Sequence, residues 1–173
     1  LWSAEPVVTR LDLAAFNHGD YSSAMRERNE IEAITCILYP DDSTEAGKAL
    51  RLKQEYFFVS AGVVDIVKNF KKNYGPDWSI FPDKISIHTN DTHPALCVPE
   101  LMRVLLDEEG LEWDEAWDIT TRTLSYTNHT IMPEALEKWS IELMRSLLPR
   151  VYQIIEEIDR RYCAAFDRSQ PDW

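Results

Sequence analysis

The sequence has no apolar run that approaches the ~20 residues needed to span a bilayer, and it has few basic residues. Lysine and arginine together number 18 against 30 acidic residues, which gives a formal net charge of -12. An acidic surface repels phosphate backbones and anionic membranes, so the composition argues against nucleic-acid binding and membrane association. The sequence shows no signal peptide and begins with Leu1 rather than Met, so we expect a piece of a longer chain.

Cysteine is also scarce. Cys36, Cys97 and Cys163 are widely spaced and form no CxxC pair. This usage is typical of free thiols in a reducing compartment, so we expect three buried thiols and a cytoplasmic protein.

Common catalytic signatures are missing as well. The sequence contains no GxGxxG, phosphate-loop, GxSxG or HExxH motif. A metal site built from His88, Asp91 and His93 matches no strong zinc spacing, so we expect no metal. Acidic residues are so abundant that most carboxylate pairs indicate only a solvated surface.

What the sequence does contain is two polar corners. The segments Thr89–Pro94 and Tyr126–Glu137 each combine histidine, asparagine and threonine beside a proline. Each follows a strand-like run and precedes a helix-like run, which is where α/β proteins place ligand sites. Two such corners predict one shared pocket for a ligand rich in hydroxyl groups.

Hydrophobic periodicity predicts eight elements in the order β, α, α, β, α, α, β, α. In chain order they cover residues 1–13, 21–37, 50–70, 84–89, 98–108, 113–123, 124–127 and 139–166, with a break or offset at Pro149. We expect 39–47 to form a polar, mobile loop broken at Gly47, and Pro94 to begin a helix capped by Thr92. Strands separated by helices predict an α/β fold with a mainly parallel sheet and flanking helices.

The histidines of these segments have different expected roles. His88 lies within a strand pattern and is interpreted as a structural histidine. His93 is compatible with a functional or a capping role. His129 follows a strand end and is the best functional candidate, because an imidazole can donate to or accept from a sugar hydroxyl.

Several motifs in order resemble the glycogen and starch α-glucan phosphorylase family. They are the run Leu50–Phe57, the approach Phe81–Lys84 to Asn90–Pro94, the segments Tyr126–Thr130 and Pro133–Glu137, the start Leu1–Ala4 and the helix from Leu148 to Ile155. The resemblance covers nearly the whole chain.

The resemblance implies two Rossmann-like domains of glycosyltransferase-B type that face each other across a cleft. Such enzymes split terminal α-1,4-glucosidic bonds of glycogen, starch or maltodextrin with inorganic phosphate and release glucose 1-phosphate. Pyridoxal phosphate is held by a lysine in the C-terminal domain. Residues 1–173 resemble only part of the N-terminal domain and contain no counterpart of that lysine, so we expect the chain alone to be inactive and the complete enzyme to be a homodimer.

The same resemblance implies roles for individual residues. His129 corresponds to a histidine that contacts the glucosyl residue and is expected to be catalytic. Asp91, His93 and Glu137 correspond to residues beside the anomeric carbon, while Asn128 and Thr130 hold the corner. The loop 41–47, with Asp42 and Ser43 as substrate-binding residues, corresponds to a mobile gate.

Two regions depart from the animal enzymes of this family. Ser43 replaces a glucose-contacting asparagine, and Thr44 replaces an aromatic residue that stacks on inhibitors. Lys68 and Asn69 replace an arginine pair that binds the nucleotide activator, so we do not expect AMP activation. The 21–37 helix resembles one that packs across the dimer.

Two other interpretations remain open at the level of the sequence. One is a free-standing glucan-binding or interaction module without catalysis. The other is a structural α/β domain without a ligand, which leaves the two polar corners unexplained.

Overall fold

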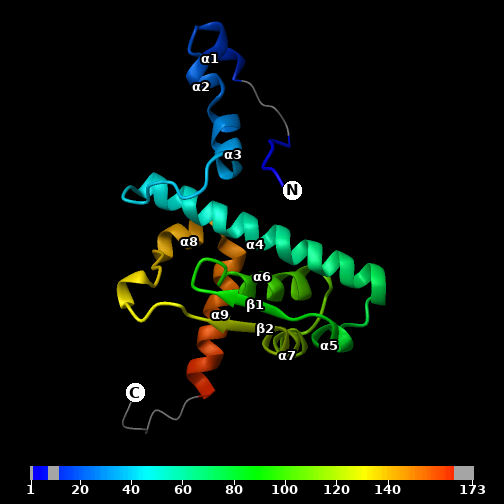
Figure 1. Ribbon diagram of the computed structural model, residues 1–173. Helices are drawn as coiled ribbons and strands as arrows, with labels where there is room; N and C mark the ends of the chain where they lie inside the picture. Colours follow the sequence, from blue (N-terminus) through cyan, green and yellow to red (C-terminus); the bar gives the residue numbers. More distant parts are fainter. Residues whose placement is uncertain (1, 8–11, 166–173) are drawn as a thin grey trace. The chain divides into compact units, whose positions relative to one another are not determined.

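A computed structural model describes residues 2–7 and 12–165, which form parts of two compact units (Figure 1). The first unit is Leu1–Phe58 and the second is Val59–Trp173. The long helix α4, Glu45–Tyr74, contributes residues to both units. Each unit is described by itself.

The first unit begins with three short helices, α1 (Leu13–Asn17), α2 (Tyr21–Ala24) and α3 (Arg26–Cys36). The carboxylates of Asp12 and Asp20 accept backbone N–H groups at the starts of α1 and α2, as favourable N-caps do. Our prediction of one helix over 21–37 is therefore wrong in one respect. Met25, with φ -101° and ψ 1°, leaves the helical conformation and separates α2 from α3.

The prediction of a strand or extended arm over 1–13 is only partly testable. Residues 2–7 carry no strand, and residue 13 already belongs to α1, where Asp12 caps the first turn. Residues 1 and 8–11 lie outside the described part of the chain.

The expected loop 39–47 is shorter than predicted, because α4 already begins at Glu45. The backbone N–H of Ser43 donates to Asp41 Oδ1 at 2.9 Å, and that of Gly47 donates to Thr44 Oγ1 at 3.1 Å. Thr44 therefore supplies a helix-start hydrogen bond that we did not predict. Gly47 does not break the helix. It lies so close to Asp41 that a methyl group at position 47 would overlap the Asp41 carbonyl oxygen.

The second unit contains a small sheet and several helices. In chain order its remaining elements are η1 (Trp78–Ile80), α5 (Phe81–Lys84), β1 (Ile87–Asn90), α6 (Cys97–Arg103), η2 (Val104–Glu108), α7 (Trp113–Thr123), β2 (Leu124–Thr127), η3 (Pro133–Ala135), α8 (Ile141–Leu147) and α9 (Pro149–Ala165).

The two strands pair in parallel, with Ile87 opposite Leu124 and Asn90 opposite Thr127 (Figure 1). The helices α6 and α7 lie between them in the chain, as a parallel connection requires. The prediction of parallel pairing is confirmed, and the architecture is compatible with an α/β fold. The described residues contain this one two-stranded sheet, so the larger sheet that we expected is not seen in them.

Some boundaries of helices and strands agree with the sequence prediction, and others differ from it. The structure confirms α7, β2 and the break at Pro149, which begins α9. The first strand begins at Ile87 rather than residue 84, because Lys84 still ends α5. The helix predicted over 98–108 begins at Cys97 and changes to π-helical geometry from Val104 to Glu108.

An apolar core joins α4 to the rest of the second unit. The predicted stripe of α4 contributes Val59, Val63, Val67 and Phe70, all buried. The Phe70 ring packs on Phe81 with the ring centroids 4.7 Å apart and the planes inclined by 70°, an edge-to-face arrangement. This packing supports the helices that flank the two strands.

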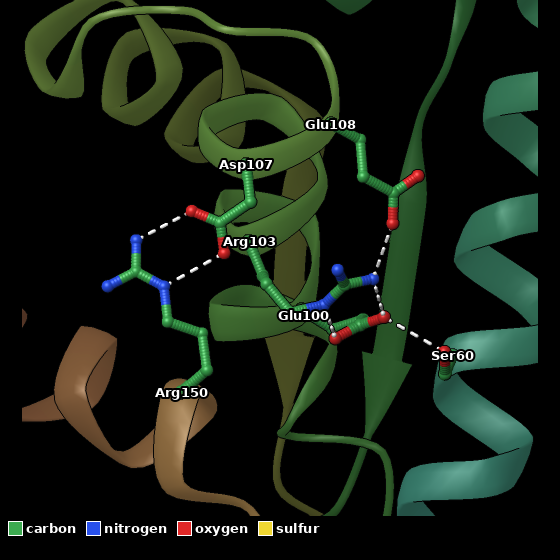
Figure 2. Close-up of polar contacts among 6 residues, drawn as sticks. All are labelled: Ser60, Glu100, Arg103, Asp107, Glu108 and Arg150. Carbon is green, nitrogen blue, oxygen red and sulfur yellow. Dashed lines mark hydrogen bonds and ion pairs between the residues drawn. The ribbon is translucent and has the colours of Figure 1, made fainter.

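A buried ionic cluster accompanies the apolar core (Figure 2). Glu100 on α6 is fully buried, and Arg103 and Ser60 point toward it from α6 and α4. On the other side of η2, Arg150 of α9 makes two hydrogen bonds to Asp107. These contacts connect four elements of the second unit.

The cysteines do not share one environment. Cys97 is buried as predicted, Cys163 is partly buried, and Cys36 is exposed. The expectation of a buried thiol is wrong for Cys36, because it is the last residue of α3, a helix without buried residues.

Candidate functional site

The two polar corners meet at the carboxyl ends of β1 and β2 (Figure 1). Asn90 and Thr127 are the last residues of the two strands and are paired in register. One residue further, the backbone N–H of Asp91 donates to the Thr127 carbonyl oxygen at 2.9 Å. Parallel pairing therefore brings segments almost forty residues apart in sequence to a common edge.

Asp91 turns the chain sharply at this edge. Its φ of +59° lies in the left-handed region, which asparagine and aspartate tolerate better than most residues. The turn directs the carboxylate toward the second corner, where Oδ1 accepts the backbone N–H of His129 at 2.8 Å. A charge-assisted hydrogen bond thus holds the backbone of the best functional candidate.

The ring of His129 has a partner of its own. Its Nε2 lies 3.1 Å from Oδ1 of Asn90. Consecutive residues, Asn90 and Asp91, therefore hold the ring and the backbone of the same histidine. The side chain is nevertheless exposed, so a ligand can reach it.

The loop after His129 is fixed by local hydrogen bonds. Asn128 Nδ2 donates to the Thr130 carbonyl oxygen at 2.8 Å, and the Thr130 N–H donates to Asn128 Oδ1 at 3.3 Å. Thr130 Oγ1 in turn accepts the N–H of Met132 at 3.2 Å. These hydrogen bonds brace the loop that follows His129.

The far end of the second corner is tied back to the first. Thr92 Oγ1 donates to Glu137 Oε2 at 3.0 Å across 45 residues of sequence. The prediction that Thr92 caps a helix beginning at Pro94 is therefore wrong. Helix α6 begins at Cys97 after turns, and its N-cap, Leu96, makes no side-chain hydrogen bond.

The remaining histidines of the second unit lie near this edge. His88 Nε2 is 2.7 Å from Thr127 Oγ1, so the interpretation of His88 as a hydrogen-bonded structural residue is confirmed. His93 is exposed on the turn after Asp91. The N-cap geometry of α6 argues against the capping role considered for His93.

The two residues predicted to form a gate belong to the first unit. Asp42 forms a 3.7 Å ion pair with Arg51, and Ser43 is exposed. Hydrogen bonds from the backbone N–H and then the side chain of Ser43 lower the pKa of the neighbouring Asp41. These contacts order the turn before α4.

Chemically, the edge presents neutral hydrogen-bonding groups beside two carboxylates, those of Asp91 and Glu137. Imidazole, amide and hydroxyl groups suit a ligand that carries many hydroxyl groups. Asn90 lies in the first polar corner, although its residue type alone predicted no role for it. Its position one residue before Asp91, at a strand end, is the signal that points to it.

The described residues offer neither a metal centre nor a membrane-spanning helix. In residues 2–7 and 12–165, no group of three or more acidic, histidine or cysteine side chains is arranged to hold a metal ion. None of the helices in this part of the chain combines the length and apolar character that a membrane crossing requires. A cavity of about 380 Å³ between α7 and α9 is lined by Trp113, Trp117 and residues of α9, and none of the predicted site residues lines it.

Comparison with known proteins assigns the chain to a class of carbohydrate-processing proteins. The model of the carbohydrate phosphorylase family matches residues 1–172. The chain belongs to this family.

Three relatives illustrate the similarity. The chain is 51% identical over 166 residues to alpha-glucan phosphorylase 2, cytosolic, from Arabidopsis thaliana, which covers 94% of this chain and 20% of the relative. It is 53% identical over 161 residues to the chloroplastic/amyloplastic L-1 isozyme of alpha-1,4 glucan phosphorylase from Solanum tuberosum. This match covers 92% of this chain and 17% of the relative. It is 52% identical over 174 residues to glycogen phosphorylase from Bacillus subtilis, a match that covers 100% of this chain and 21% of the relative. The chain thus spans about a fifth of the length of these relatives.

Proposed function

We propose that this chain is part of a 1,4-α-glucan phosphorylase, which cleaves terminal α-1,4-glucosidic bonds with inorganic phosphate to give glucose 1-phosphate. Family membership supports the reaction class. The observation that carries the proposal is the hydrogen bond from the His129 backbone to Asp91, which joins the two polar corners while leaving the His129 ring exposed.

In this proposal His129 contacts the terminal glucosyl residue. Its main chain is held by Asp91, so the ring projects from a fixed backbone at the edge of the sheet. A positioned hydrogen-bonding group beside the sugar orients the substrate and favours the oxocarbenium-like transition state of glycosyl transfer. His129 therefore acts on the sugar through position and hydrogen bonding.

The neighbouring residues line and support the same pocket. We assign Asp91, His93 and Glu137 to the region beside the anomeric carbon, and Asn128 and Thr130 to the wall that holds the corner. The Thr92 to Glu137 hydrogen bond supports this assignment, because it closes the second corner onto the first. Asp42 and Ser43 are assigned to a gate at the start of α4.

The complete fold in this proposal is Rossmann-like and of glycosyltransferase-B type, with residues 1–173 as part of its N-terminal domain. The parallel β1 and β2 pair, connected through helices, is consistent with that fold. Pyridoxal phosphate would be bound by the C-terminal domain. No segment of this chain resembles the one that carries the cofactor lysine in the family, so we assign the attachment site to that domain.

The partners follow from the same proposal. The substrates are an α-1,4-glucan (glycogen, starch or maltodextrin) and inorganic phosphate, and the protein partner is a C-terminal domain. A homodimer is proposed for the complete enzyme, and exposed apolar side chains such as Leu13 and Tyr21 in the first unit are compatible with such a contact. We propose a cytoplasmic location, as for the relative named cytosolic, although another relative is named chloroplastic/amyloplastic.

The central test is His129→Ala in the full-length enzyme. We expect turnover in glucan phosphorolysis to fall by more than about tenfold, because a positioned polar group is lost from the transition state. Circular dichroism and the melting temperature should stay near those of the wild type. His18→Ala, the same change at an exposed histidine of the first unit, is the matched control and should have normal turnover. Normal turnover in His129→Ala would remove this residue from the mechanism.

A second test uses the 173-residue chain alone, with pyridoxal phosphate added. We expect no release of glucose 1-phosphate from glycogen or maltodextrin. Release by the isolated chain would contradict the assignment of the cofactor site to another domain. Saccharide binding by a natural 20.1 kDa protein, without phosphate dependence, would instead favour the glucan-binding module.

A further inference from the structure

We propose that Asn90 is a positioning residue that sets the tautomer of the His129 ring, and that His129 therefore presents an unprotonated Nδ1 to the ligand. This inference rests on the proposed function for the identity of the ligand, a sugar hydroxyl. The contact between the two side chains stands independently of that function.

The chemistry of the contact determines which ring nitrogen of His129 carries the proton. Oδ1 of Asn90 lies 3.1 Å from Nε2 of His129. An amide oxygen can only accept a hydrogen bond, so a neutral imidazole that bonds to it must carry its proton on Nε2. The other ring nitrogen, Nδ1, then has a lone pair and accepts a hydrogen bond.

Both partners of this contact are held in place by further hydrogen bonds. Asn90 is the last residue of β1 and is paired in register with Thr127, two residues before His129. The next residue, Asp91, accepts the His129 N–H at 2.8 Å and donates its own N–H to Thr127 at 2.9 Å. Backbone and ring of His129 are therefore held from two adjacent positions of one strand end.

The tautomer of His129 determines which ligand groups its free ring nitrogen can bind. An Nδ1 lone pair selects a group that donates a hydrogen bond, such as a hydroxyl. It disfavours a fluorine or an ether oxygen at the same place, because those groups can only accept. Asn90 thus influences specificity without touching the sugar, much as outer hydrogen-bond partners orient histidines in metal sites.

Two substitutions separate this role from a purely structural one. Asn90→Ala removes the acceptor and frees the ring, so we expect kcat/KM for phosphorolysis to fall about tenfold, as when outer-shell partners are lost. Asn90→Asp keeps the size of the side chain but adds a negative charge beside Nε2. The charge favours the doubly protonated ring, so the acidic limb of the pH profile of kcat/KM should move to higher pH.

A matched control isolates the position of the charge. Asn73→Asp makes the same chemical change at an exposed position near the end of α4 and should leave the pH profile unchanged. The carboxylates of Asp91, bonded to the His129 N–H, and of Glu137, bonded to Thr92, are present in both variants. A difference between the pH profiles of Asn90→Asp and Asn73→Asp is therefore caused by the charge at position 90.

The ring itself provides a readout that does not require activity. Nitrogen-15 spectra of histidine-labelled full-length protein, assigned with His129→Gln, should show the Nε2-protonated tautomer for His129, and Asn90→Asp should raise the midpoint of its titration. A ring protonated on Nδ1, or profiles of Asn90→Asp and Asn73→Asp that coincide, would overturn the role of Asn90. A wild-type protein with the expected tautomer but no phosphorolysis would overturn the proposed function and leave the Asn90 to His129 pairing intact.

Discussion

The fully buried carboxylate of Glu100 is held by the guanidinium of Arg103 through two hydrogen bonds of 2.9 Å (Figure 2). Ser60 on α4 donates a third hydrogen bond, also 2.9 Å long. Arg103 extends the cluster to Glu108 in the π-helical segment η2. A buried charge costs free energy unless it is paired and hydrogen-bonded, so this cluster is sensitive to the loss of either partner.

Glu100→Gln should destabilise the protein by about 2 kcal/mol. The substitution keeps the shape of the side chain, but it replaces the carboxylate that pairs with the largely buried Arg103 by a neutral amide, which is a weaker partner. Denaturation by urea measures the loss. Glu108→Gln removes a half-exposed partner of the same arginine and should cost less than about 1 kcal/mol. Equal losses in the two variants would show that burial of Glu100 is not what makes the contact important.

The pair Asp107 and Arg150 predicts a dependence of stability on pH. Hydrogen bonding to Arg150 lowers the pKa of Asp107. A carboxyl whose pKa is lowered by folding adds stability above its unfolded pKa, about 3.9 for Asp. That stability is lost as the pH falls through the folded pKa.

We therefore compare wild type with Arg150→Met by urea unfolding from pH 7 downward. At pH 7 the variant should be less stable by under about 1 kcal/mol, because both side chains are partly exposed. The difference should shrink as the pH falls below about 3.9. Arg145→Met, which breaks a more exposed pair with Glu156, should show a smaller difference. A difference for Arg150→Met that is constant with pH would mean that packing, and not charge, causes the loss.

The cysteines should differ in reactivity. Burial, and secondarily the charge of Glu100, raises the pKa of Cys97 to about 11. At pH 8 only about one Cys97 in a thousand is then a thiolate, the reactive form. Iodoacetamide should label the exposed Cys36 in the native protein and Cys97 only after denaturation, as mass spectrometry of the tryptic peptides would show. Labelling of both at similar rates in the native protein would contradict the buried position of Cys97.

The sequence predicts those elements whose signals are local. Helix α7 has an amphipathic pattern and β2 follows it at once, so both were located correctly. Pro149 lacks a backbone N–H and therefore favours the first position of a helix, where α9 begins. Met25 carries no comparable signal, and the separation of α2 from α3 was missed.

In the candidate site, too, local sequence signals predict the segments involved but not the contacts between them. The two polar corners were recognised from their composition, and parallel strands explain why they meet. The contact between Asn90 and His129 depends on the register of β1 against β2, which a short strand pattern does not determine. The Thr92 to Glu137 hydrogen bond likewise joins residues 45 positions apart, so helix-capping rules assigned Thr92 a local role that it does not have.

Two glycines of α4 should respond to alanine in opposite directions. At Gly62 an added Cβ meets no atom within 4 Å, so Gly62→Ala should stabilise the protein by about 0.5–1 kcal/mol through the higher helix propensity of alanine. At Gly47 an added Cβ would overlap the Asp41 carbonyl oxygen, and a clash with backbone is relieved only if the turn moves. Gly47→Ala should therefore cost more than about 1 kcal/mol.

Thermal unfolding followed by circular dichroism at 222 nm compares the two variants directly. Gly62→Ala should melt above the wild type and Gly47→Ala below it. The two substitutions make the same chemical change in the same helix, so helix propensity alone would shift both melting temperatures upward. A higher melting temperature for Gly47→Ala would show that α4 does not begin at Glu45 against the Asp41 turn, and that the polar loop extends through Gly47 as the sequence suggested.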